Sequence, residues 1–402
     1  MDQKRRNENV KKRRVFYIPG YDPFHPRRYR ELYRKEGRSQ ADISDYTLDL
    51  KAKNGGGRYG WFVSAQIDGK KTTTEFDVLV WSDIVRGSMD IGTVQTYGLL
   101  LRTAYTYITS GALRALMKLR KGPVIAALYP VGMLLLQAML AVMMGLLVWY
   151  FTVGIHPIIG VVLAAAAILM LLRYFRKIDN KLFVYYLMHD YAYSAQHNGA
   201  NSPDLETRMA AFKTEIAQAL HSDVDEVLVV GHSSGAHIGI SVVADLLRDT
   251  TWDGPDLSVL TLGQVVPMVS FLPDAWRLRA DLQFLSTRRD ITWVDVTAPG
   301  DGCAFALCDP VGVSGVATPD QKWPLVFSAA FTHSLSKERW KELRWKFFRL
   351  HFQYLCAFDQ PKDYDYFQIT AGPVPLQVRY QDRSPSKSRI VAATSPHNGV
   401  EP

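Results

Sequence analysis

The sequence predicts an α/β protein: a mainly parallel sheet flanked by helices and interrupted by a two-helix transmembrane hairpin. Apolar runs alternate along the chain with helical patterns, and the runs are continuous, as in parallel strands covered on both faces. A central stretch of 51 residues, 122–172, contains no Asp, Glu, Lys or Arg. With 402 residues, the chain is long enough to bury one large core or two modest ones.

The chain begins with a basic segment, "MDQKRRNENVKKRR", which holds seven Lys and Arg and almost nothing apolar. We expect residues 1–13 to be disordered. The net charge is +8, but no aromatic or motif context accompanies the basic residues, so nucleic-acid binding is not expected. The N-terminus lacks an apolar export segment, and the three cysteines are therefore expected to be reduced thiols in a cytosolic compartment.

Two strands are expected before the hairpin, within a first part of the core at 14–97. "RVFYIPGY" (14–21) reads as a buried strand that ends at a Pro-Gly pair, and "EFDVLVWSDIV" (75–85) reads as a second strand. The next segment mixes apolar and aromatic residues with scattered Arg, which is typical of a helix lying along a membrane surface. We therefore group 98–181 as an interfacial helix plus the hairpin.

The uncharged stretch fits two membrane spans and a turn. One helix of that length would be about 75 Å long, against a hydrocarbon core of about 30 Å. We predict spans at 123–151 and 155–172, with the reversal near Gly154 and Pro157. Basic residues flank both outer ends and none lies in the turn. The positive-inside rule then predicts an inner-membrane protein with both termini in the cytoplasm.

The second part of the core, 182–382, shows helices and strands in alternation. Ser202 and Pro203 begin a helical segment that runs to 220, with an N-cap, a proline at the first position and acids in the first turn. Strands are expected at 226–230, 257–266 and 291–298, and helices from 235 and near 274–285. The last residues, 383–402, are expected to form a flexible tail.

The sequence Gly231-His232-Ser233-Ser234-Gly235 matches the pattern G-x-S-x-G. At ordinary glycine and serine usage, chance produces about 0.1 such matches in a chain of this length. The match follows a predicted parallel strand and opens a predicted helix, as a nucleophile elbow requires. Ser233 is then the candidate nucleophile, and the backbone N–H of Ser234 is a candidate oxyanion donor. The alternative is a glycine-rich helix entry that binds a phosphate or nothing.

These residues resemble the α/β-hydrolase superfamily, of serine esterase and lipase type. The order of strand, G-x-S-x-G, helix, strand, helix, strand, acid and histidine is similar over about 15–85 and 204–375. The resemblance implies that the loop in "FYIPGYDP" supplies a second oxyanion donor, the backbone N–H of Tyr21. A Pro-Gly pair stands there, where the family usually has His-Gly.

A nucleophilic serine needs a base and a carboxylate that orients the base. For the acid we favour Asp301, which follows a Pro-Gly turn after a strand, over Asp295 in mid-strand and, third, Asp309. For the base we favour His333, in "THSLSKERW", which is similar to the histidine segment of class 3 lipases. His351 is the alternative. It falls inside a predicted helix, "WKELRWKFFRLHFQYL", where a histidine is typically a core residue.

Together these features predict a membrane-anchored, cytoplasm-facing serine hydrolase that acts on an acyl ester, with lipids as a candidate class. Two alternatives stay open: a catalytically inactive scaffold with the hydrolase fold, and an acyltransferase that uses the same triad. The expected partners are the lipid bilayer and an ester or lipid substrate. No metal or organic cofactor is expected, since Cys303 and Cys308 are not accompanied by the further Cys or His ligands that a zinc site requires.

Overall fold

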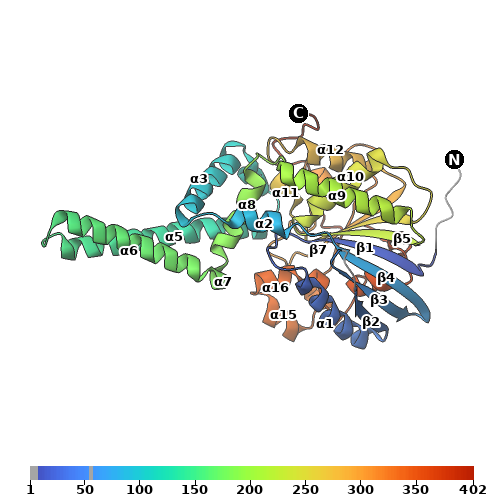
Figure 1. The fold of residues 1–402 in the computed structure, drawn as a ribbon. Coiled ribbons are helices and arrows are strands. Elements are labelled where there is room, and N and C mark those ends of the chain that lie inside the picture. Colours follow the sequence, from blue (N-terminus) through green and yellow to red (C-terminus); the bar gives the residue numbers. More distant parts are fainter. Residues whose placement is uncertain (1–7, 54–57) are drawn as a thin grey trace.

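An eight-stranded, mostly parallel sheet organises the molecule (Figure 1). The computed structural model describes residues 8–53 and 58–402. The strand order is β2-β3-β4-β1-β5-β6-β7-β8. From β4 to β8 every neighbouring pair is parallel, whereas β3 is antiparallel to both β2 and β4. The strands are β1 (Lys12–Ile18), β2 (Thr47–Ala52), β3 (Gly60–Ile67), β4 (Lys70–Val78), β5 (Glu226–His232), β6 (Asp256–Leu262), β7 (Ile291–Thr297) and β8 (Leu325–Ser328).

Helices cover both faces of the sheet, which explains why the central strands are apolar throughout. On one face lie α9 (Pro203–Leu220), α10 (Gly235–Asp249) and α12 (Trp276–Thr287) (Figure 1). On the other lie α1 (Arg27–Ser44) and C-terminal segments that include α17 (Tyr366–Ala371). The expected mainly parallel α/β sheet is present, and Ser202 caps α9 by accepting a hydrogen bond from the Leu205 N–H.

Three elements near the N-terminus were not expected from the sequence. Helix α1 and strands β2 and β3 precede β4, and the strand expected at 75–85 ends at Val78 before α2 (Ser82–Met89) begins. Strand β2 lies at the sheet edge and has no buried residue. An exposed edge strand carries too few apolar residues to stand out in a search for buried strands.

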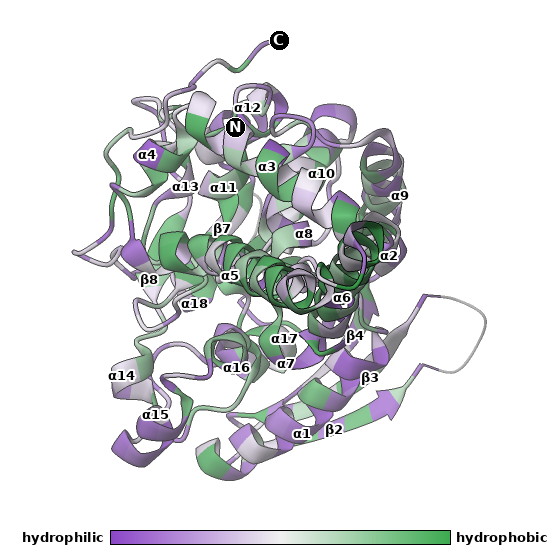
Figure 2. Ribbon diagram, turned by 90° about the vertical axis from the view of Figure 1, so that its left-hand side faces the viewer, coloured by the Kyte–Doolittle hydropathy of each residue, from purple (hydrophilic) through white to green (hydrophobic). Residues whose placement is uncertain are grey.

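The uncharged stretch forms two long helices, α5 (Lys121–Thr152) and α6 (Pro157–Lys177), which lie side by side and project from the domain (Figure 1). Both are long and apolar enough to cross a membrane. Helix α6 is about 32 Å long at 1.5 Å per residue, close to the thickness of the hydrocarbon core. Most exposed large apolar side chains of the described residues belong to this hairpin, which Figure 2 views nearly along its length.

The base of the hairpin packs on three helices: α3 (Thr93–Thr109), α4 (Ala112–Leu116) and α8 (Val184–Ala195). The Tyr97 hydroxyl of α3 donates a hydrogen bond to the Leu134 carbonyl of α5 (3.1 Å). The segment expected to form one interfacial helix is therefore α3 and α4. Helix α3 leaves Leu101, Tyr105 and Ile108 exposed on its outer side.

Both ends of the chain differ from expectation where the structure describes them. Of the N-terminal segment expected to be disordered, residues 1–7 lie outside the described residues, but β1 begins at Lys12 and Arg13 is buried. The C-terminal segment is held by hydrogen bonds rather than free: the Ile390 N–H donates to Leu307, and Arg279 donates to the Gly399 carbonyl. The expectation of a flexible tail at 383–402 does not fit these contacts.

The remaining elements are short connections. They are α7 (Asp179–Leu182), α11 (Val266–Ser270), α13 (Pro310–Val313), α14 (Phe331–Ser334), α15 (Lys337–Leu343), α16 (Phe347–His351), the 3-10 helix Gln353–Leu355 and α18 (Leu376–Arg379).

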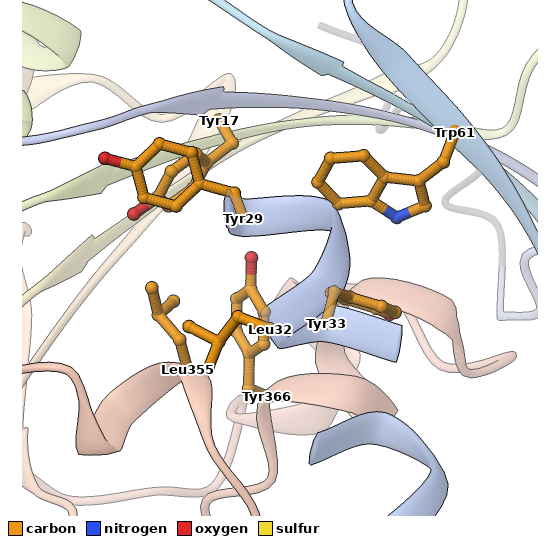
Figure 3. Close-up of a pocket in the computed structure, with 7 residues that line it drawn as sticks. All are labelled: Tyr17, Tyr29, Leu32, Tyr33, Trp61, Leu355 and Tyr366. Atoms are coloured by element: carbon orange, nitrogen blue, oxygen red, sulfur yellow. The ribbon is translucent and has the colours of Figure 1, made fainter. Parts of the chain in front are cut away.

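A small void lies between α1, the sheet and the C-terminal segments (Figure 3). Rings of Tyr17, Tyr29, Tyr33 and Tyr366 surround it, and its volume is about 10 Å³. That is about the space of one water molecule, so it is a packing gap of the core and too small for a substrate.

Candidate active site

Ser233 occupies a strained turn between β5 and α10. Its φ is 56°, in the left-handed region that residues other than glycine rarely adopt. Its N–H donates to the Leu262 carbonyl of the neighbouring strand (2.9 Å), and its carbonyl accepts from the Ala236 N–H (3.0 Å). These bonds hold the serine at the carboxyl edge of the sheet, in the geometry expected of a nucleophile elbow.

Close backbone packing explains the glycines of the motif. A Cβ at Gly235 would lie 2.1 Å from the Ile18 carbonyl oxygen, and one at Gly231 would lie 2.6 Å from the Gly235 carbonyl oxygen. Gly20, in the loop after β1, is similar: its Cβ would lie 2.8 Å from the Ser233 Cβ. The turn therefore requires glycine at all three positions, and the loop after β1 lies directly against the serine.

Asp301 and His351 form a buried pair beside this turn. The His351 Nδ1 and the Asp301 Oδ2 are 2.8 Å apart. Asp301 also accepts hydrogen bonds from the Tyr354 hydroxyl (3.0 Å) and the Cys303 N–H (2.9 Å). Burial by itself would raise the pKa of Asp301, but His351 and these donors outweigh it and lower the pKa, which keeps the carboxylate charged.

The histidine beside Asp301 is therefore His351, the alternative, whereas His333 is exposed in α14. The helix expected around His351 is broken: α15 ends at Leu343, and α16 ends at His351 itself. At the C-terminal end of α16, the His351 imidazole reaches Asp301 in the loop after β7. The preference for His333 followed from its similarity to the histidine segment of class 3 lipases, and the sequence pattern did not indicate the helix break before His351.

His232, the residue directly before Ser233, supports the backbone of His351. Its Nε2 lies 3.0 Å from the His351 carbonyl oxygen. Burial lowers the pKa of His232 to about 3, so the ring is neutral and its Nε2–H donates this hydrogen bond. His232 thus holds the backbone of His351, which lines the same cavity as Ser233.

The two other candidate acids lie away from this pair. Asp295 is buried within β7 and accepts a hydrogen bond from the Thr261 hydroxyl (2.6 Å). Burial raises its pKa to about 8, so it is uncharged at neutral pH. Asp309 caps α13 through the N–H groups of Val311 and Gly312. Of the three carboxyls, Asp301 is the one bonded to a histidine.

The Ser233 turn, the end of α16 and the loop after β1 line one cavity of about 60 Å³. Ser233, His351, Gly20 and Tyr21 all line it. The loop that carries Tyr21 is fixed by the indole N–H of Trp81, which donates to the Pro19 carbonyl (2.8 Å). Ser234 is buried directly before α10, at the helix N-terminus. Of the two residues expected to donate to the oxyanion, Tyr21 thus lines the cavity of Ser233, and Ser234 follows the serine directly.

Asp190, on α8, is a further residue of this cavity that the sequence did not single out. Burial raises its pKa to about 7, while His351 and the Ser234 hydroxyl act in the opposite direction. Asp190 comes from the segment just after the hairpin, and no motif surrounds it. Its position close to Ser233 follows from how α8 packs over the carboxyl edge of the sheet.

One group of described residues could in principle hold a metal ion: donor atoms of Asp301, Cys303 and His351 lie within 4.8 Å of one another. The Asp301 Oδ2 already accepts hydrogen bonds from His351 and Tyr354. Burial raises the pKa of the Cys303 thiol well above its usual value, whereas a metal needs the thiolate. The group fits a hydrogen-bonded acid–base pair better than a metal centre.

No protein-family model, curated protein or solved structure matches this chain. The architecture is an eight-stranded, mostly parallel α/β sheet flanked by helices, with two apolar helices long enough to span a membrane.

Proposed function

We propose that this protein is a membrane-anchored serine hydrolase of α/β-hydrolase type that cleaves acyl esters. One observation carries the proposal: a serine with a left-handed backbone lines the same cavity as His351, whose ring is hydrogen-bonded to the buried Asp301. The same three residue types act together in serine hydrolases on unrelated folds, so the constellation is more informative than the sequence motif alone.

In the proposed reaction, the Ser233 Oγ attacks the ester carbonyl carbon while the His351 Nε2 takes the hydroxyl proton. The Nδ1–H of His351 donates to Asp301, which orients the ring and stabilises its positive charge. The backbone N–H groups of Tyr21 and Ser234 bind the oxyanion. His351 then protonates the leaving alcohol. Water attacks the acyl-enzyme with His351 as base, and the carboxylic acid and free Ser233 are released.

The inactive scaffold considered from the sequence gains no support from this arrangement. Burying a charged carboxylate is costly unless it is paired, and a scaffold does not need a histidine beside a strained serine as the partner of that carboxylate. Here Asp301 is paired with His351 and Tyr354, and His351 lines the cavity of Ser233. The geometry therefore favours catalysis. The protein acts as a hydrolase if water accepts the acyl group and as an acyltransferase if an alcohol accepts it.

The direct test is covalent labelling of the purified full-length protein with a fluorophosphonate probe. We expect stoichiometric labelling of the wild type at Ser233, located by peptide mass spectrometry, because the probe reacts with activated serines. Ser233→Ala is expected to remove the label and Ser234→Ala to keep it. Equal labelling of the Ser233→Ala variant would contradict the assignment of the nucleophile.

A second expected result concerns pH. Asp190 loses its proton near pH 7 and then places a negative charge beside the proposed oxyanion site. Ionised Asp190 opposes the developing oxyanion. As the pH rises from 6 to 8.5, we therefore expect Asp190→Asn to keep a several-fold larger fraction of its kcat/KM at pH 6 than the wild type keeps. Pre-steady-state and steady-state ester hydrolysis across this range would measure the ratio. Parallel profiles for the two proteins would mean that Asp190 does not act on the reaction.

We further propose that α5 and α6 cross a membrane as a hairpin. Arg120 and Lys121 stand at the start of α5, Arg176 and Lys177 stand at the end of α6, and the turn between the helices has no Lys or Arg. Trp149, Tyr150 and Phe151 are exposed near the turn, where aromatic side chains suit the interface. This arrangement supports the cytoplasmic location of the sheet domain.

Cysteine labelling tests this topology. His156 is exposed in the turn, and Asp382 is exposed on the sheet domain. In spheroplasts, a membrane-impermeant maleimide is expected to label His156→Cys but to label Asp382→Cys only after lysis. The native cysteines are buried or partly buried, so background labelling should be low. Labelling of both positions without lysis, or of neither, would contradict a spanning hairpin.

A further inference from the structure

A second cavity, about 140 Å³ in volume, lies at the base of the hairpin. Its walls come from α3, α4, α5 and α8, with α11 and the loop before α13 closing the inner side. The lining is almost entirely apolar and includes Tyr107, Leu116, Val124, Ala127, Met188 and Phe305. The sheet itself contributes nothing to it, so this cavity exists because the hairpin segment is inserted into the domain.

The apolar cavity adjoins the cavity of Ser233. Tyr191 of α8 and Met268 of α11 line both of them. The Tyr107 hydroxyl donates to the Met268 carbonyl (2.9 Å), which ties α3 to this shared wall. Methionine is an adaptable side chain with three rotatable bonds, so a wall that includes Met268 can open with little strain.

On its other side the cavity reaches the molecular surface at the base of the hairpin. Ile108 of α3 and Leu128 of α5 line it, with exposed fractions of 62% and 47%. They belong to the same apolar surface as the hairpin itself, which would lie in or against lipid if the hairpin spans a membrane. An apolar path therefore runs from that surface to the shared wall of the Ser233 cavity.

We infer that this cavity is the acyl-binding site and that the substrate is an ester of an aliphatic carboxylic acid whose chain enters from the bilayer side. The inference rests on the proposed serine hydrolysis and adds the substrate class to it. A chain seated between α3, α4 and α5 with its head past Tyr191 and Met268 brings its ester carbonyl to Ser233. Burial of methylenes supplies the binding energy, since the walls offer almost no polar partner.

The volume limits the chain. A dry apolar cavity of about 150 Å³ in another protein accepts benzene, so about six carbon atoms fit at this size. Each methylene that leaves water contributes about 0.8 kcal/mol, or about fourfold in binding. We therefore expect kcat/KM to be much larger for esters of acids with about six carbons than for acetate esters. We expect kcat/KM to level off for longer chains.

The test is a series of p-nitrophenyl esters, from acetate to dodecanoate, with the full-length protein in phosphatidylcholine nanodiscs. Ala127→Trp fills the cavity and is expected to reduce the hexanoate-to-acetate ratio of kcat/KM by at least tenfold. Ala126→Trp is the matched control on the same helix, since Ala126 does not line the cavity and should keep the ratio. Leu113→Ala enlarges the cavity and is expected to move the optimum to longer chains.

The outcomes separate the two proposals. If Ser233 is labelled and esters are hydrolysed, but both cavity variants keep the wild-type chain-length profile, the acyl site is wrong and the proposed function stands. If no ester is hydrolysed and Ser233 does not react with fluorophosphonate, the proposed function fails and the acyl site with it. Opposite shifts by Ala127→Trp and Leu113→Ala, in proteins that both still label at Ser233, support the acyl site.

Discussion

His351→Ala is expected to lower kcat for the proposed ester hydrolysis by about 10³- to 10⁶-fold, the range seen when a histidine is removed from a catalytic triad. Without the imidazole, Ser233 has no base to accept its proton, and the charged Asp301 loses the partner that lies 2.8 Å away. Initial rates with p-nitrophenyl hexanoate measure kcat, and a fluorescence melting curve checks that the variant is folded.

The matched control is His333→Ala. His333 is exposed in α14, and its replacement is expected to leave kcat within about twofold of the wild type, as for an ordinary surface substitution. The pair of variants decides between the two histidines that the sequence leaves open. A large loss for His333→Ala together with a small one for His351→Ala would overturn the assignment of the base.

Arg13→Met is expected to lower the free energy of unfolding by about 3–5 kcal/mol, the usual cost of removing one partner of a buried ion pair. The Arg13 and Glu226 side chains are both fully buried, and the Nε–Oε2 distance is 2.7 Å. Arg13 also donates to the carbonyls of Gly372 and Val374. Its loss leaves a buried carboxylate unpaired and frees the C-terminal segment from β1. Urea unfolding followed by tryptophan fluorescence measures the change.

Lys12→Met provides the comparison at the neighbouring position. Lys12 pairs with Asp223, but both side chains are largely exposed, and exposed pairs add little to stability. We expect no measurable shift of the urea midpoint for this variant. The double variant Arg13→Met/Glu226→Gln is expected to be more stable than Arg13→Met, because the unpaired charge is gone. Equal losses for Arg13→Met and Lys12→Met would show that burial does not set the strength of this ion pair.

The features predicted correctly are those that leave a local pattern in the sequence. The alternation of continuous apolar runs with helices predicted the mainly parallel α/β sheet, and Ser202-Pro203 predicted the start of α9. The uncharged stretch predicted two long apolar helices. The turn at Ser233 followed from the glycines around it, since close backbone contacts permit no side chain at those positions.

The identity of the residues around Ser233 was decided by the tertiary structure. His351 lies beside Asp301 because a predicted helix breaks into α15, α16 and a 3-10 turn, and hydrophobic periodicity does not indicate where a helix stops when both sides of the break remain apolar. Asp190 enters the site because α8, which follows the hairpin, packs over the edge of the sheet.

The sequence by itself therefore determined the class of sheet, the apolar hairpin and the turn at Ser233, because each leaves a pattern among residues near in the chain. The tertiary structure decided which histidine reaches Asp301 and that the carboxyl of Asp295 stays uncharged. It also decided that the C-terminal segment is held against the domain by hydrogen bonds. The physical reason is that these outcomes depend on which segments pack together, and those segments lie far apart in the chain. Arg279 and Gly399, for example, are hydrogen-bonded across 120 residues. Local patterns indicate which strands are buried, but they do not indicate which distant segments meet.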